Sequence, residues 1–266
     1  MKQVTHNSEP DTSPHRIVLL GASNLTFALR NTLAGVMART QGPVEIYAAW
    51  GPGRSYGLQA GMPFLKFAGI NRCGMWQALD EAQQQRPGAK LHALLTDVGN
   101  DLLYTGDTRL VLRWVETCVN RLREMGADVG ITAPPVSSVV RLGPLRYLAL
   151  RSLFFPRSRM SRQQAFQLLG RLQDGLGRMA EQPGVNLLPV ERDWYGLDRF
   201  HIKRGQRSKV FHQWLDELLE RPIAQSEGVG LSLAGIRKQR DWFFGRERHT
   251  PQAGYELNER TLLYAY

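Results

Sequence analysis

The chain has 266 residues, of which 42% are hydrophobic and 22% charged, and this size and balance suit one large globular domain with a buried core. The sequence has no run near the ~20 apolar residues that a membrane-spanning helix needs and no apolar segment typical of a secretory signal near its start, so we expect a cytoplasmic protein. The excess of 34 Lys and Arg over 24 Asp and Glu gives a net charge of +10, which bears on the partners of the protein rather than on its fold.

Predicted strands and helices alternate along the chain. Short apolar runs that end at glycine, proline or polar residues predict strands, and longer segments with apolar residues three and four positions apart predict helices. In chain order, the elements are a strand at 16–21, a helix at 24–40, a strand at 43–49, a helix at about 74–86, a strand at 91–99, a helix at 108–125, a strand at 127–135, a helix at 161–181, a strand at 185–190 and a helix at 205–220. Asn24 is a candidate N-cap of the first helix. The apolar side of that helix carries Leu25, Leu29, Leu33 and Val36.

This alternation predicts an α/β fold, a three-layer α/β/α sandwich with a mostly parallel five-stranded sheet. In such sheets, the functional residues gather at the carboxyl ends of the strands. Four strand exits are polar or rich in glycine, and we expect all four to line one edge of the sheet: 21–24, 51–54, 97–101 and 193–201.

We expect the domain to span 16–220, after a mobile leader at 1–15 and before a C-terminal extension at 221–266. The extension holds aromatic residues without a clear period. It could wrap the core, complete a dimer or reach across the active-site edge, and the sequence leaves the oligomeric state open. The two cysteines, Cys73 and Cys118, are expected to be reduced thiols in or near the core.

Ser23 follows the first predicted strand and precedes the first predicted helix. A sharp turn at this point can expose its Oγ near the positive end of the helix. Serine is also a common turn residue and helix cap, and a serine hydroxyl becomes a good nucleophile only when a base within hydrogen-bond reach takes its proton. The role of Ser23 therefore depends on finding that base.

His201 is the best candidate for the base, because Asp198 lies three residues before it on one polar loop. From that position, the carboxylate can turn back and accept the Nδ1 proton, which fixes the tautomer and stabilises the imidazolium. The other histidines lie in the leader, at a strand start, inside a helix or in the extension: His6, His15, His92, His212 and His249.

Acyl transfer also needs donors for the oxyanion of the tetrahedral intermediate. The N–H of Ser23, the N–H of Gly53 and the side-chain amide of Asn100 could converge there. Gly53 suits the role because a glycine lets the backbone approach a ligand closely, although it could also be an ordinary turn glycine. Asn100 could equally serve an Asx-turn. Together with His201, these residues stand at four strand exits, which favours the catalytic interpretation.

Short blocks of the sequence resemble the motifs of the SGNH hydrolase superfamily, in family order and spacing. They are GASNL at 21–25 in place of the GDS motif, Gly53 after the second strand, Gly99-Asn100-Asp101, and Asp198-Arg199-Phe200-His201 with Gly205 beyond it. The resemblance spans 16 to about 220 and implies a sandwich of the SGNH type, related to flavodoxin-like folds. It also implies esterase, lipase, thioesterase or sugar-deacetylase activity, with no metal and no cofactor.

Two residues depart from the family pattern. Ala22 stands where relatives have an aspartate, which removes the carboxylate that normally braces the turn. Ile202 stands where a proline commonly follows the histidine. These differences indicate a divergent member of the superfamily. They bear on which substrate is used more than on whether the triad is present.

The sequence thus predicts a serine hydrolase that cleaves a small-molecule ester or thioester through an acyl-enzyme on Ser23. Asp198 and His201 complete the triad, and Ser23, Gly53 and Asn100 form the oxyanion hole. Transfer of the acyl group to another acceptor stays open, because water and a hydroxyl compete for the same intermediate. The alternative is a catalytically silent binding protein of the same fold, whose basic insertion contacts a membrane or another anionic partner.

The basic insertion at 136–162 lies in a longer stretch, between Asp128 and Asp174, that has seven arginines and no acidic residue. The arginines are Arg141, Arg146, Arg151, Arg157, Arg159, Arg162 and Arg171. The insertion could pack on the domain with solvated arginines, cover the active site as a lid, or hold an anionic membrane surface. Nucleic-acid binding is disfavoured, because no signature of a nucleic-acid-binding fold accompanies the charge.

Overall fold

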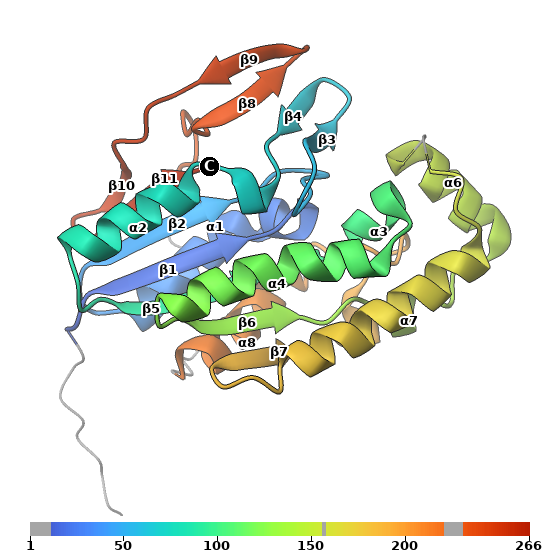
Figure 1. Cartoon of the computed structure of the whole chain (residues 1–266), viewed down its shortest axis with the longest axis horizontal. Coiled ribbons are helices and arrows are strands. Elements are labelled where there is room, and N and C mark those ends of the chain that lie inside the picture. Colours follow the sequence, from blue (N-terminus) through green and yellow to red (C-terminus); the bar gives the residue numbers. More distant parts are fainter. Residues whose placement is uncertain (1–11, 156–157, 221–230) are drawn as a thin grey trace, which may run out of the picture.

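The computed structural model describes residues 12–155, 158–220 and 231–266. They form a three-layer α/β/α sandwich, as predicted, in which one large sheet lies between two layers of helices (Figure 1). The strands of this sheet, in spatial order, are β10 (Tyr255–Asn258), β11 (Thr261–Ala265), β2 (Val44–Ala49), β1 (His15–Leu20), β5 (Lys90–Leu95), β6 (Asp128–Thr132) and β7 (Val185–Leu188). All neighbours are parallel except β10 and β11.

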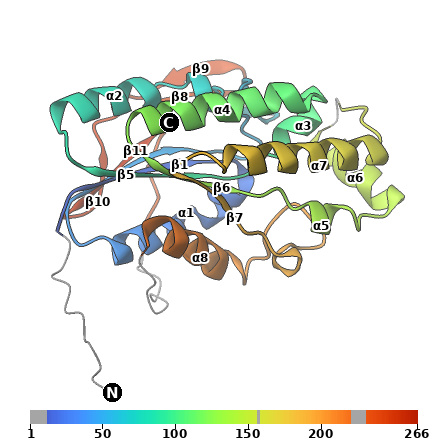
Figure 2. The same ribbon diagram turned by 60° about the horizontal axis from the view of Figure 1, so that its bottom comes forward.

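The alternation of side chains in β1 explains the two helical layers. Ile17 and Leu19 pack with one core, and Val18 and Leu20 pack with the other, because successive residues of a strand point to opposite faces. The first face is covered by α1 (Ser23–Arg39) and α8 (Arg207–Leu219). The second is covered by α2 (Met75–Gln85), α4 (Thr108–Glu124) and α7 (Arg162–Met179) (Figure 2). All four apolar residues predicted on one side of α1 are buried.

The carboxyl ends of the three central strands are level. Leu20 is the register partner of both Ala49 in β2 and Leu95 in β5. The loops that follow these strands therefore start at the same edge of the sheet, which confirms the prediction for three of the strand exits. The fourth exit joins them through hydrogen bonds to Asn24, described below. Strand β5 ends earlier than predicted, because Asp97 adopts a left-handed φ of 62°.

The sheet has seven strands rather than the predicted five, and both additional strands come from the extension. β11 pairs in parallel with β2, and its Leu263 and Ala265 are fully buried opposite Ile46 and Ala48. The described part of the extension, 231–266, thus wraps the core, which is one of the three roles considered for it from the sequence. No strand was predicted there, because β10 and β11 are short and lie far along the chain from the strand that they extend.

A second sheet was also not predicted. It contains the short antiparallel strands β3 (Ala60–Met62), β4 (Leu65–Phe67), β8 (Arg240–Phe243) and β9 (Arg246–His249), in that order. His15, expected in the leader, is buried in β1, while residues 1–11 of that leader lie outside the described part. Cys73 and Cys118 are buried and unbridged, as predicted.

Short helices connect the larger elements. They are η1 (Ile70–Arg72), α3 (Asn100–Thr105), α5 (Val136–Val139), α6 (Pro144–Phe154) and η2 (Arg192–Trp194). The basic insertion therefore consists largely of α5 and α6, which lie near the outer end of α7 (Figure 2). Within the described ranges, no helix is long and apolar enough to cross a bilayer.

Candidate active site

Ser23 lies on a tight turn between β1 and α1. Gly21, two residues before it, donates its N–H to the carbonyl of Ala49 over 3.1 Å. A Cβ at Gly21 would lie 2.2 Å from Oγ1 of Thr96, so only glycine fits at this point of the turn. Ser23 is the first residue of α1, and its Oγ lies 3.0 Å from Nε2 of His201.

The loop after β7 carries His201 and Asp198. The Nδ1 of His201 lies 2.7 Å from Oδ2 of Asp198, and Oδ1 accepts the backbone N–H groups of Phe200 and His201 over 3.0 Å each. Burial alone would raise the pKa of Asp198, but these hydrogen bonds outweigh it and hold the pKa below its usual value. An ionised Asp198 accepts the Nδ1 proton, which leaves Nε2 to accept the proton of Ser23.

Asn24 does not cap α1, contrary to the sequence prediction. The N-cap is Ala22, and the side chain of Asn24 reaches away from its own helix. Its Nδ2 donates to Oδ1 of Asp97 over 2.7 Å and to the carbonyl of Phe200 over 3.0 Å, and its Oδ1 accepts the N–H of Ile202 over 2.8 Å. Asn24 therefore holds the backbone on both sides of the histidine.

Asp97 braces the serine turn from the neighbouring strand exit. Its Oδ2 accepts the N–H of Ala22 over 2.8 Å and the N–H of Leu25 over 3.3 Å. We expected the turn to lack a bracing carboxylate, because Ala22 replaces the aspartate of the family motif. That expectation is wrong, since Asp97 supplies the carboxylate from the end of β5. We call Asn24 and Asp97 together the clamp.

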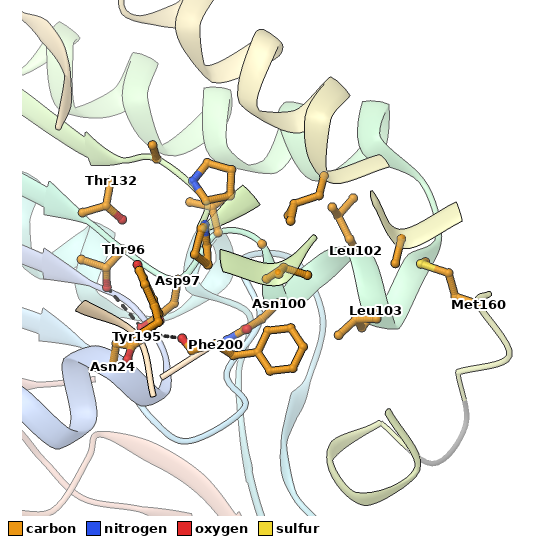
Figure 3. Close-up of a pocket in the computed structure, with 18 of the residues that line it drawn as sticks. Asn24, Thr96, Asp97, Asn100, Leu102, Leu103, Thr132, Met160, Tyr195 and Phe200 are labelled. Carbon is orange, nitrogen blue, oxygen red and sulfur yellow. Dashed lines mark hydrogen bonds between the residues drawn. The ribbon is translucent and has the colours of Figure 1, made fainter. Parts of the chain in front are cut away.

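The two remaining oxyanion candidates lie on neighbouring loops. Asn100 begins α3 and lines the same cavity as Asn24 and Asp97 (Figure 3). Gly53 has a left-handed φ of 67°, which suits glycine, and its carbonyl accepts the hydroxyl of Tyr104 over 2.8 Å. Among the described residues, the hydrogen bonds connect Gly53 to this region through Tyr104 rather than directly to Ser23 or His201.

Two phenylalanines that the sequence did not single out flank the histidine ring. The ring centroid of Phe27 lies 5.5 Å from that of His201, and the centroid of Phe154 lies 5.7 Å from it, both edge-on. Phe27 follows Ser23 by four positions on α1 and therefore lies on the same side of the helix, a signal that the sequence contains. Phe154 comes from α6, and the sequence around it does not predict a contact with His201.

A cavity opens beside the serine turn, between the edge of the sheet and the helices α3, α5 and α7 (Figure 3). Its polar end is formed by Asn24, Asp97 and Asn100, and its remaining wall is mainly apolar. The wall residues include Leu102, Val139, Tyr147, Met160, Ala165 and Leu169. The insertion at 136–162 thus contributes to the cavity wall, while Arg157 of that segment lies outside the described residues.

Asp101, the last residue of the third motif block, is buried beneath the site. Its Oδ2 accepts the N–H of Tyr56 over 2.8 Å. Burial raises its pKa to about 6, because the charged form loses its hydration. Asp101 therefore supports the loop after β2 rather than facing the cavity.

The sequence matches no family model and none of the curated proteins. Among solved structures, the chain is similar to the psychrotrophic esterase EstA from Pseudoalteromonas sp. in a form inhibited by monoethylphosphonate, with 13% identity over 77% of this chain and 97% of that one and a TM-score of 0.44. It is similar to TesA, with 14% identity over 76% and 99% and a TM-score of 0.44. It is also similar to the acetyl xylan esterase AlAXEase, with 11% identity over 76% and 98% and a TM-score of 0.47.

Proposed function

We propose that this protein is a carboxylic-ester hydrolase that works through an acyl-enzyme on Ser23. One observation carries the proposal: the continuous hydrogen-bonded chain from Ser23 Oγ through the His201 ring to Asp198, with links of 3.0 and 2.7 Å. Nucleophile, base and orienting carboxylate in this order are the arrangement that activates a serine for acyl transfer. The clamp supports it, because it ties the turn of the nucleophile to the loop of the base.

In the proposed reaction, His201 takes the proton of Ser23 as the oxygen attacks the carbonyl carbon of an ester or thioester. The tetrahedral intermediate collapses when the imidazolium returns that proton to the leaving alcohol or thiol. Water then repeats both steps on the acyl-enzyme and releases the acid. Asp198 stabilises the imidazolium in each half-reaction.

The oxyanion of the intermediate needs two or three donors that are aimed at it before the reaction. We propose the N–H of Ser23, the N–H of Gly53 and the amide of Asn100 for this role. The position of Asn100 in the cavity wall beside the serine turn supports its part. The acyl group of the substrate would then enter the apolar part of that cavity.

Hydrolysis of short and medium p-nitrophenyl esters by the wild type and by Ser23→Ala tests the proposal. We expect turnover by the wild type and its loss in the variant, because the nucleophile is absent. Labelling with a fluorophosphonate should add one adduct to the wild type, seen by intact mass, and none to Ser23→Ala. Ser232→Ala, at an exposed serine far along the chain, is the matched control and should be labelled like the wild type.

An unlabelled wild type that leaves all of these esters intact would contradict the enzymatic proposal. It would favour the catalytically silent binding protein instead. Adding an alcohol to the active enzyme and measuring the ratio of new ester to free acid separates hydrolysis from acyl transfer. The cytoplasmic location remains a prediction of the sequence.

A further inference from the structure

Large apolar side chains beside the proposed active site and on the neighbouring helix α6 are exposed to water. Phe27 and Phe154, which flank His201, are 48% and 40% exposed. Leu197, next to Asp198, is 80% exposed. Helix α6, which carries Phe154, also exposes Leu145, Leu148 and Leu153, which are 84%, 48% and 72% exposed. We call these six residues the apolar rim. An exposed apolar patch on a protein surface marks a site of interaction.

Helix α6 is anchored to the rest of the protein, so its exposed leucines do not reflect a detached helix. Of the eleven residues of α6, Tyr147 alone is buried. Its hydroxyl donates to the carbonyl of Met160 over 3.1 Å, and a guanidinium N–H of Arg151 donates to the same carbonyl over 3.2 Å. Arg162 at the start of α7 donates to the carbonyl of Leu142, just before α6, over 2.6 Å. The helix is therefore held from its inner side, where Leu150 also packs on the core, while Leu145, Leu148 and Leu153 are turned to solvent.

The surroundings of the rim are positively charged. The sequence has no acidic residue between Asp128 and Asp174, a stretch that contains all of α6. Arg141, Arg146 and Arg159 are exposed around this helix. On the other side of the mouth, the guanidinium of Arg207 lies 4.6 Å from the ring centroid of Phe27. An apolar surface with arginines around it matches an anionic lipid surface, where leucine and phenylalanine enter the acyl boundary and arginines meet the phosphates.

We propose that the apolar rim docks on an anionic lipid bilayer and presents Ser23 to esters at that surface. Presentation of Ser23 to esters rests on the proposed function, whereas the docking does not. Because Phe27 and Phe154 touch both the catalytic ring and the docking surface, an amphiphilic ester could pass from the bilayer to Ser23 without crossing water. The expected substrate class is therefore esters that partition into membranes.

Sedimentation with vesicles tests the docking on full-length Ser23→Ala, which cannot consume an ester and so gives a result independent of catalysis. The vesicles are phosphatidylcholine with and without phosphatidylglycerol. We expect binding to the phosphatidylglycerol vesicles, weaker binding at high salt, and little binding to phosphatidylcholine alone. Adding Leu145→Ser and Leu153→Ser together should weaken binding at least about tenfold, because two exposed leucines no longer enter the bilayer.

Phe244→Ser is the matched control. Phe244 is 72% exposed, like Leu153, but it lies at the turn between β8 and β9, outside the rim. We expect this variant to bind as tightly as its parent, and both sets of variants to keep the parent's melting temperature. Arg141→Gln with Arg146→Gln should reduce binding to the anionic vesicles.

Three results would overturn the docking proposal. The first is no binding to anionic vesicles, and the second is an equal loss of binding in Phe244→Ser and in the leucine variant. The third is a dimer in light scattering that the leucine substitutions dissociate, without vesicle binding, because the rim would then be covered by a second copy of the chain. An inactive wild type that still binds vesicles through the rim would refute the proposed function and leave the docking standing.

Discussion

Substitutions in the clamp test whether Asn24 and Asp97 position the serine against the histidine. Asn24→Ala removes a hydrogen bond to the carboxylate of Asp97 and two to the backbone on either side of His201. At about 1 kcal/mol for each neutral bond and about 2 kcal/mol for the charged one, the three are worth about 4 kcal/mol together. Asn24 is half-buried, so water replaces part of this loss. We expect the free energy of unfolding to fall by about 2–3 kcal/mol.

The effect on catalysis should be larger than the effect on folding suggests. A displacement of about 1 Å between reacting groups can lower a rate about 100-fold, and the clamp joins the two loops whose side chains meet at 3.0 Å. We therefore expect kcat per labelled active site to fall about 100-fold in Asn24→Ala, with KM nearly unchanged. Normalising to the sites that react with a fluorophosphonate removes the contribution of unfolded protein.

The double substitution Asn24→Asp with Asp97→Asn restores a donor and an acceptor between the two side chains, with their roles reversed. It should recover part of kcat, although the new carboxylate faces the carbonyl of Phe200. We expect a coupling of about 1–2 kcal/mol in kcat between the two sites, as for residues in one hydrogen-bond network. Gln83→Ala is the control, because Gln83 bridges Arg16 and the carbonyl of Met125 at the opposite end of β1. It should cost stability without changing kcat per site. Additive effects of the two clamp substitutions, or the same loss of kcat in Gln83→Ala, would refute the positioning role.

Two further predictions concern the third motif block. Asn100→Ala should lower kcat about 100- to 1,000-fold with little change in KM, as loss of one oxyanion donor does, and an unchanged kcat in steady-state assays would remove Asn100 from the oxyanion hole. Asp101→Asn should alter the pH dependence of stability. The folded protein holds the Asp101 proton up to about pH 6, whereas the unfolded chain releases it near pH 4. Asp101 therefore lowers the free energy of unfolding as the pH rises from about 4 to about 6. One pKa unit is worth about 1.4 kcal/mol, so across this range the free energy of unfolding of the variant should rise by about 3 kcal/mol relative to the wild type, as measured by urea unfolding. A difference between the two proteins that stays constant with pH would contradict the raised pKa of the buried carboxyl.

The sequence predicts the sandwich well where an element is long and regularly patterned. Helix α1 was expected at 24–40 and lies at Ser23–Arg39, because its apolar residues repeat over four turns. The second sheet was missed, because β3 and β4 have three residues each and carry no readable alternation. Strand β11 was missed because its partner β2 lies near the other end of the chain, so no local pattern identifies it.

The candidate site shows the same division. Asp198 and His201 could be predicted together, because the residues that form their hydrogen bond lie three positions apart. The role of Asp97 could not, because an aspartate after a strand is also an ordinary turn residue, and its partners lie on a turn far earlier in the chain. Asn24 was assigned to its own helix cap for a similar reason: the competing partners, Phe200 and Ile202, come close only after the sheet has formed.

The position of β11 has a consequence for the synthesis of this protein. Strand β2 has a paired outer edge only when Thr261–Ala265 lies against it, and this segment leaves the ribosome after every other described element. Until then, a nascent chain in which β1, β2 and β5 have already paired presents the open, apolar edge of Val44–Ala49, a template for strand pairing between chains. The end of β2 also accepts the hydrogen bond that fixes Gly21 beside the serine. That hydrogen bond forms on the β1 side, so the serine turn can order before β11 arrives, whereas shielding of the outer edge of β2 during translation limits aggregation of the nascent chain.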